Sequence, residues 1–339
     1  GVASLDYIRL HKKYSFKDEP SYKLDSLGEK YVDQKKIEYE GSLDRLFEED
    51  KEKFIEYNFV DVLILKKLDE KFKYIELTKN LAHKGKILYE EVYQSSRIHD
   101  GAISSWLISQ NIVPPNKELN PITKKNYAGG YLFCPKTGIY NYMFDEDLTS
   151  LYPSIIMSLN IGKETYLGRV LDSFNDRNNR LGLNDLESRV AEDPESTLPL
   201  ENTARKIQNT RVSDIIDKVK NHNLTITANG VMFRTDKKSV LSVILSKWFD
   251  ERVKYKNAMK KAYQSGDKKE GEQNHLKQYT MKILLNSLYG ATALPSFRYG
   301  SVILSEAITL SGQRIIQESA LFANTHMNKV LRNELKLEL

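Results

Sequence analysis

Two short stretches of this sequence hold residue types and spacings suited to binding a nucleoside triphosphate. Residues 147–154 read Asp-Leu-Thr-Ser-Leu-Tyr-Pro-Ser and place one carboxylate before a turn of small polar residues and a tyrosine. Residues 282–290 read Lys-Ile-Leu-Leu-Asn-Ser-Leu-Tyr-Gly and place a lysine, an asparagine and a tyrosine on one helical face. A carboxylate can hold a divalent cation, and cationic helix residues can neutralise phosphates. Together the two stretches predict a triphosphate site.

The residues around Asp147 favour a metal-binding role for its carboxylate. Residues 141–144 predict a strand that ends just before Asp147, and residues 148–150 predict a sharp turn. Backbone N–H groups in residues 150–152 could then meet phosphate oxygens. The alternative is a helix N-cap, because Asp, Thr and Ser all cap helices well.

Residues 239–290 predict two long helices joined near Gly266. Arg252 lies 14 residues before this glycine and Lys282 lies 16 after it. At about 1.5 Å per residue, both lie roughly 20–25 Å from the turn, so they stand at a similar level in an antiparallel pair. One cationic strip across the two helices would comprise Arg252, Lys256, Lys282 and Asn286.

The composition is that of a globular protein with a local excess of positive charge. The 339 residues are 40% hydrophobic and 29% charged, with a net charge of +5. Residues 246–290 hold ten Lys/Arg and five Asp/Glu, so this segment alone accounts for that charge. A solvated lysine-rich helix pair is the alternative explanation. A single cysteine, Cys134, excludes an intrachain disulfide framework, and no apolar run approaches a membrane span. We therefore expect a cytoplasmic protein (in the host cytoplasm if it is viral).

The amino-terminal third predicts mostly helices. We interpret residues 1–75 as mixed α/β, ending in a helix over residues 51–70, and residues 76–112 as helical up to a proline-rich boundary. The helix over 51–70 has a broad apolar face formed by Phe54, Phe59, Val62, Leu63, Leu65 and Leu68.

The middle of the chain predicts short strands separated by a polar segment. Residues 130–134 and 138–144 predict a β-hairpin, and Asn229-Gly230 predicts a turn before a strand over 231–233. Residues 172–222 are rich in Asn, Asp, Arg and Glu, and we interpret them as a surface excursion.

The stretches 147–154 and 282–290 resemble polymerase motifs of family B DNA polymerases, including the bacteriophage members. The resemblance implies that Asp147 binds Mg²⁺, that Lys282 acts on the triphosphate, and that Tyr152 lies under the incoming sugar. Arg252 and Lys256 resemble the basic pair of the opposing fingers helix. The nucleotide-binding residues so implied are Leu148, Ser150, Leu151, Tyr152, Arg252, Lys256, Lys282, Asn286 and Tyr289.

Two further motifs resemble parts of the same family. Tyr127-Ala-Gly-Gly130 resembles its Tyr-x-Gly-Gly template-binding loop, which implies that Tyr127, Gly129 and Gly130 bind DNA, and Gly290 would line the nascent base pair. Tyr57-Asn-Phe-Val-Asp61 resembles the third motif of the 3′–5′ exonuclease, with Tyr57 orienting a water and Asp61 holding a metal. A plain turn and a structural Tyr–Asp pair are the respective alternatives.

The resemblance implies an α+β fold in five segments: the end of an RNase H-like exonuclease domain (1–75), a connecting piece of the amino-terminal domain (76–118), a first palm part (119–238), antiparallel helical-hairpin fingers (239–294) and a second, incomplete palm part (295–339). The second acidic polymerase motif and two exonuclease acid motifs have no counterpart in the sequence. The two-ion Mg²⁺ site is therefore incomplete, and we expect a chain that is inactive alone. A crystallised fragment, an incomplete gene and one half of a split polymerase are the three explanations.

The partners implied are primer-template DNA, dNTPs and a second polypeptide that would supply the missing acids and the thumb. The alternative from another class is a non-catalytic nucleic-acid-binding or assembly subunit that keeps the polymerase fold. Asp147, Tyr152, Lys282 and Asn286 together argue against it, because DNA binding alone requires no triphosphate site.

Overall fold

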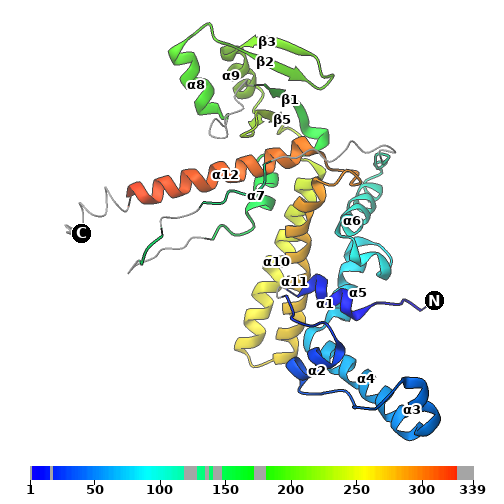
Figure 1. Cartoon of the computed structure of the whole chain (residues 1–339). Coiled ribbons are helices and arrows are strands. Elements are labelled where there is room, and N and C mark those ends of the chain that lie inside the picture. The colour runs from blue at the N-terminus through cyan, green and yellow to red at the C-terminus, as the bar shows by residue number, and fades with distance from the viewer. Residues whose placement is uncertain are drawn as a thin grey trace. The chain divides into compact units, whose positions relative to one another are not determined.

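A computed structural model describes residues 2–15, 18–117, 128–133, 137–139, 147–171 and 181–326 (Figure 1). The chain divides into two compact units, Gly1–Ala102 and Ile103–Leu339. Within the described residues, no helix is both long and apolar enough to cross a membrane.

The described residues of the first unit form helices and contain no strand. The elements are α1 (Tyr7–Tyr14), α2 (Leu24–Val32), α3 (Leu43–Glu49), α4 (Lys51–Phe72), α5 (Tyr74–Gly85), the 3-10 turn η1 (Tyr89–Tyr93) and the first part of α6 (Ser95–Ser109). Local capping explains part of this: the Asp6 carboxylate accepts hydrogen bonds from the backbone N–H groups of Ile8 and Arg9 and so starts α1. The expectation of mixed α/β structure over residues 1–75 is therefore wrong for its described part.

Helix α4 confirms the predicted helix but not its broad apolar face. Ile64 and Leu68 are fully buried and pack with Leu27 of α2. Phe59 and Val62, by contrast, are 66% and 65% exposed. Among the described elements of this unit, α4 makes its main contacts with α2 and α3, so only a narrow stripe of the helix is covered.

A five-stranded antiparallel sheet lies in the second unit, with strand order β3-β2-β1-β5-β4. After the 3-10 turn η2 (Lys163–Thr165), its elements in chain order are β1 (Tyr166–Val170), α8 (Leu183–Glu192), β2 (Thr197–Asn202), β3 (Ile207–Arg211), α9 (Val212–Asn221), β4 (Thr225–Ile226) and β5 (Val231–Phe233). The turn predicted at Asn229-Gly230 is confirmed, and Gly230 adopts a φ of +77° that favours glycine.

The described part of residues 172–222 is a packed portion of this sheet and its covering helices, which corrects its interpretation as a surface excursion. Leu186 of α8 and Ile215 of α9 are buried against Val170 of β1 and Met232 of β5. Most of the apolar residues of this segment pack into one cluster, although Ile207 is exposed. A composition dominated by polar residues does not reveal this packing.

Four helices form the rest of the second unit. They are α7 (Leu151–Ser158), α10 (Val240–Gln264), α11 (Lys268–Thr292) and α12 (Val302–Thr325). Helices α10 and α11 have 25 residues each and lie side by side, joined through Gly266 at a φ of +83° (Figure 1). Helix α7 contacts all three of the others, and this brings residue 151 and its neighbours to the helix pair.

The predicted β-hairpin lies largely outside the described residues. Residues 130–133 and 138–139 are described and are not strands, whereas 134–136 and 140–146 fall outside the description.

Candidate functional site

The turn that begins with Asp147 ends at the first residue of α7. Asp147 is exposed, and Ser150 adopts a left-handed backbone conformation with a φ of +54° just before Leu151. The Ser150 side chain does not cap the helix; instead its hydroxyl accepts a hydrogen bond of 3.0 Å from Nη1 of Arg252. The N-cap alternative therefore does not account for Ser150. Arg252 belongs to the predicted basic pair on α10. Although it is 102 residues from Ser150 in the sequence, it directly contacts this turn.

Tyr152 lies in the first turn of α7 and contacts the second predicted motif. Its ring centroid is 4.4 Å from that of Tyr289 on α11, with an interplanar angle of 31°. A Cβ atom added to Gly312 of α12 would lie 3.0 Å from the Tyr152 ring, and one added to Gly130 would lie 3.3 Å from its hydroxyl. Two glycines thus give Tyr152 its space. The structure brings the two sequence motifs into contact through this pair of tyrosines.

The predicted cationic residues lie on the same pair of helices. Arg252 is half-buried, and Lys256 is exposed one turn later on α10. Lys282 and Asn286 are exposed on α11, on the helical face that also carries Tyr289. Exposed ammonium and amide groups on α10 and α11, the two helices that contact α7, form a surface that can bind an anionic ligand.

The other predicted nucleotide- and DNA-binding residues differ in their contacts and exposure. The Gln313 side-chain amide on α12 donates a hydrogen bond to the Gly129 carbonyl, so the glycine pair 129–130 lies next to the tyrosine site. Gly290 is exposed, and a Cβ atom added there would meet no described atom within 4 Å. Leu148 and Leu151 are half-buried. Tyr127 lies outside the described residues.

Tyr57 and Asp61 lie on α4 in the first unit, where Lys36 joins them. Lys36 Nζ is 2.8 Å from Asp61 Oδ2 and 4.7 Å from the centre of the Tyr57 ring. Burial alone would lower the pKa of Lys36, but hydrogen bonds with Asp61 and Tyr57 raise it above its ordinary value. The lysine therefore stays charged and neutralises the carboxylate on which a metal was expected.

The described residues do not by themselves form a metal site at Asp147 or at Asp61. No three His, Cys, Asp or Glu side chains in the described part of the chain are grouped so as to hold an ion. Asp147 offers one exposed carboxylate, and Asp61 is already paired with an ammonium. A two-ion site for Mg²⁺ would need further carboxylates.

Three residues that contact the predicted site residues were not predicted from the sequence. Lys36 is separated from Asp61 by 25 positions, and Gly312 and Gln313 stand in the middle of α12, far from the motifs they contact. Nothing in their local sequence distinguishes them. Only the packing of α12 against α7 and the fold of the first unit bring them to the motifs.

An acidic turn, an arginine and facing tyrosines beside exposed cations define a candidate binding site for a nucleoside polyphosphate. A sequence profile of DNA polymerase family B matches residues 87–339. The chain is 29% identical to the DNA-directed DNA polymerase of Escherichia phage RB69 and 27% identical to that of Enterobacteria phage T4, over 98% and 97% of its length. The chain belongs to DNA polymerase family B.

A solved structure agrees with this membership at the level of the fold. The family B DNA polymerase of the hyperthermophilic archaeon Pyrobaculum calidifontis matches 94% of the chain with a TM-score of 0.61 at 16% identity. The chain spans 38% of the length of each phage polymerase and 36% of the archaeal one.

Proposed function

We propose that this chain is the nucleotide-binding central portion of a DNA-directed DNA polymerase, which adds dNTPs to a primer under direction of a template. The observation that carries the proposal is the junction of the two motifs. Ser150 accepts a hydrogen bond from Arg252, and the rings of Tyr152 and Tyr289 lie 4.4 Å apart. A purely structural role for either motif would not require exposed cations around that junction.

The proposed roles follow from chemistry and position. Arg252, Lys256, Lys282 and Asn286 bind the triphosphate, because guanidinium, ammonium and amide groups donate to phosphate oxygens. Tyr152 lies beneath the sugar, where a rigid ring excludes a ribose 2′-OH. The start of α7 adds to the phosphate site, because the N-terminus of a helix favours anions.

We assign the segments accordingly. Residues 239–294 act as the fingers, 119–238 and 295–339 as the palm, 76–118 as the connecting piece and 1–75 as the end of an exonuclease domain. The assignment of the fingers is supported by the two 25-residue helices α10 and α11. The primer-template would contact Tyr127, Gly129, Gly130 and Gly290, of which Gly129 and Gly130 lie beside the tyrosine pair.

The chain alone does not extend a primer at a useful rate under this proposal. Phosphoryl transfer requires divalent cations held by several carboxylates, and Asp147 is one carboxylate without a grouped set around it in the described residues. A second polypeptide that carries the missing carboxylates would complete the site. Robust Mg²⁺-dependent extension by the purified chain would contradict this part of the proposal.

Nucleotide binding is the test that separates a polymerase portion from a DNA-binding subunit. We expect Lys282→Ala to weaken dATP binding by about tenfold or more, since a charged hydrogen bond is worth roughly 1.5–3 kcal/mol. Lys254→Ala removes the same charge from a different face of the helix pair and is the matched control. Equal effects of both substitutions would mean that only general charge matters and would refute the proposal.

The activity test uses the chain mixed with a separately made polypeptide that bears the missing carboxylates. We expect primer extension only in the mixture, and its loss on Asp147→Ala. No extension despite confirmed association and dATP binding would assign this chain a nucleotide-binding role without catalysis.

A further inference from the structure

The helical face that carries Arg252 and Lys256 continues along α10 beyond the candidate site. Lys260 and Tyr263 follow at the next positions of the same face, eight and eleven residues after Arg252. Lys260 is exposed, and the Tyr263 side chain is 47% exposed. No acidic residue occupies this face from Arg252 to Tyr263, a length of about 16 Å.

The matching face of α11 carries two stacked rings. Tyr279 and His275 precede Lys282 by three and seven residues, so all three share one helical face. The rings of His275 and Tyr279 are parallel to within 6°, with centroids 6.2 Å apart. The nearest acid on this face is Glu272, one turn beyond His275.

Two contacts fix the register between the helices. Lys277 lies over the Tyr255 ring at 5.8 Å, and a Cβ atom added to Gly271 would lie 2.5 Å from the Tyr263 ring. Lys260 therefore lies opposite the stretch that precedes His275. Packed helices are separated by about 8–10 Å, so one nucleotide can touch both of them. We name Lys260, Tyr263, His275 and Tyr279 the outer strip.

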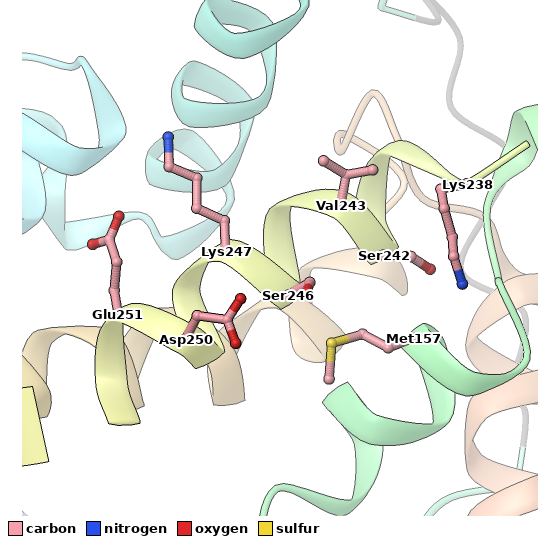
Figure 2. Close-up of a pocket in the computed structure, with 8 residues that line it drawn as sticks. All are labelled: Met157, Lys238, Ser242, Val243, Ser246, Lys247, Asp250 and Glu251. Atoms are coloured by element: carbon pink, nitrogen blue, oxygen red, sulfur yellow. The ribbon is translucent and has the colours of Figure 1, made fainter. Parts of the chain in front are cut away.

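The opposite face of α10 also carries three lysines, but it has a different charge pattern. Lys247, Lys254 and Lys261 are interleaved there with Asp250 and Glu251. A hollow of about 620 Å³ opens on this side, and Figure 2 shows Lys238 and Lys247 together with both carboxylates among its lining residues. Two positive and two negative side chains give that hollow no preference for an anion.

We propose that the outer strip is a loading site for nucleoside triphosphates, occupied before the ligand reaches Arg252 and Lys282. Lys260 attracts the polyphosphate, and the stacked rings of His275 and Tyr279 offer a face to the base. The α10 face from Arg252 to Tyr263 carries three cations and no acid, and a cationic surface raises the local concentration of anionic ligands and thereby their association rate. The inference rests on the proposed function, because it assumes that the inner site binds a triphosphate.

Adjacent lysines on α10 provide a matched test. Lys260→Glu reverses a charge in the outer strip, and Lys261→Glu reverses the same charge on the opposite face of α10. Association and dissociation rates of methylanthraniloyl-dATP would be measured by stopped-flow fluorescence with the full chain at low and high salt. We expect Lys260→Glu to slow association about tenfold at low salt and to leave dissociation nearly unchanged, with less than a twofold effect of Lys261→Glu.

The difference between the two variants should vanish at about 1 M salt, where the screening length falls to about 3 Å. A second arm tests the rings: His275→Gln should slow association of the nucleotide more than that of inorganic tripolyphosphate, measured by competition. Equal effects of Lys260→Glu and Lys261→Glu would overturn the loading site alone. Unchanged binding in Lys282→Ala would instead overturn the proposed function, so the two failures are distinguishable.

Discussion

Asn160 ties the end of α7 to the start of α10, and we expect Asn160→Ala to be among the most destabilising single substitutions in the second unit. Its side chain is 1% exposed. The amide nitrogen donates to the backbone carbonyls of Arg234 and Lys237 at 2.6 and 2.8 Å, and the amide oxygen accepts from the backbone N–H of Ser239 at 2.8 Å. Ser239 is the N-cap of α10. One side chain thus satisfies three backbone groups just before the long helix.

The expected loss follows from these contacts and from the backbone. Three hydrogen bonds at about 1 kcal/mol each contribute roughly 3 kcal/mol. Asn160 also has a φ of +55°, which costs alanine about 1 kcal/mol more than asparagine. We therefore expect the free energy of unfolding to fall by about 4 kcal/mol.

Equilibrium urea unfolding followed by tryptophan fluorescence measures this loss, because Trp248 on α10 is buried. Asn223→Ala is the matched control, since exposed Asn223 has a similar φ of +49°. We expect the control to lose only about 1 kcal/mol. If both variants lost the same amount, the three hydrogen bonds would contribute nothing net and the reasoning would be refuted.

Three further perturbations test other parts of the fold. Lys36→Met leaves the partly buried Asp61 carboxylate without its cation and should lower the free energy of unfolding by about 1–2 kcal/mol. In urea unfolding, the double variant with Asp61→Asn should regain most of this loss, and a lack of rescue would argue against the ion pair. Gly230→Ala places a Cβ atom 2.4 Å from a main-chain oxygen at a φ of +77° and should lower the free energy of unfolding by at least about 2 kcal/mol. The control Gly266→Ala, at a φ of +83° in open space, should lower it by about 1 kcal/mol. Equal thermal shifts of the two variants would disprove the clash. Burial lowers the pKa of His99 from 6.5 to about 3, so the unfolded chain binds a proton that the folded unit rejects, and stability is lost as the pH falls below 6.5. We expect a loss of about 2 kcal/mol between pH 7.5 and 5 in urea unfolding, largely absent in His99→Leu, and an unchanged pH slope in that variant would contradict the assignment.

The long helices and the Asn229-Gly230 turn were predictable from sequence because their signals are local. Helix α10 begins at a serine N-cap, α11 begins at an aspartate N-cap, and Gly266 separates them. The sheet portion within 181–222 was not predictable. Strand β2 contains Pro199 although it pairs on both sides, and proline in such a position argues against a strand. The surrounding polar residues concealed the apolar positions that converge in the fold.

The candidate site was predictable as a set of residue types but not as a set of contacts. Arg252 was placed level with Lys282 by counting residues along two helices, and nothing in the sequence indicated that its partner would be the hydroxyl of Ser150. Tyr152 and Tyr289 came from separate motifs, and their contact depends on how α7 packs on α11. Gly312 leaves room for the Tyr152 ring, and Gln313 donates a hydrogen bond to the Gly129 carbonyl. Both contacts are with distant parts of the chain, so the sequence around these two residues does not indicate them.

Contacts at both ends of α7 connect the fold to the site. At its carboxyl end, Asn160 and Ser239 join it to the start of α10, and the Ser242 hydroxyl donates to the Ile156 carbonyl at 3.0 Å. At its amino end, Ser150 accepts from Arg252, which lies 13 residues after Ser239 and therefore about 20 Å further along α10. Two rigid helices joined at both ends fix the distance between the Asp147 turn and the cationic strip. Loss of the Asn160 contacts should consequently weaken dATP binding as well as stability, whereas a site formed only by local motif geometry would lose stability and keep its affinity.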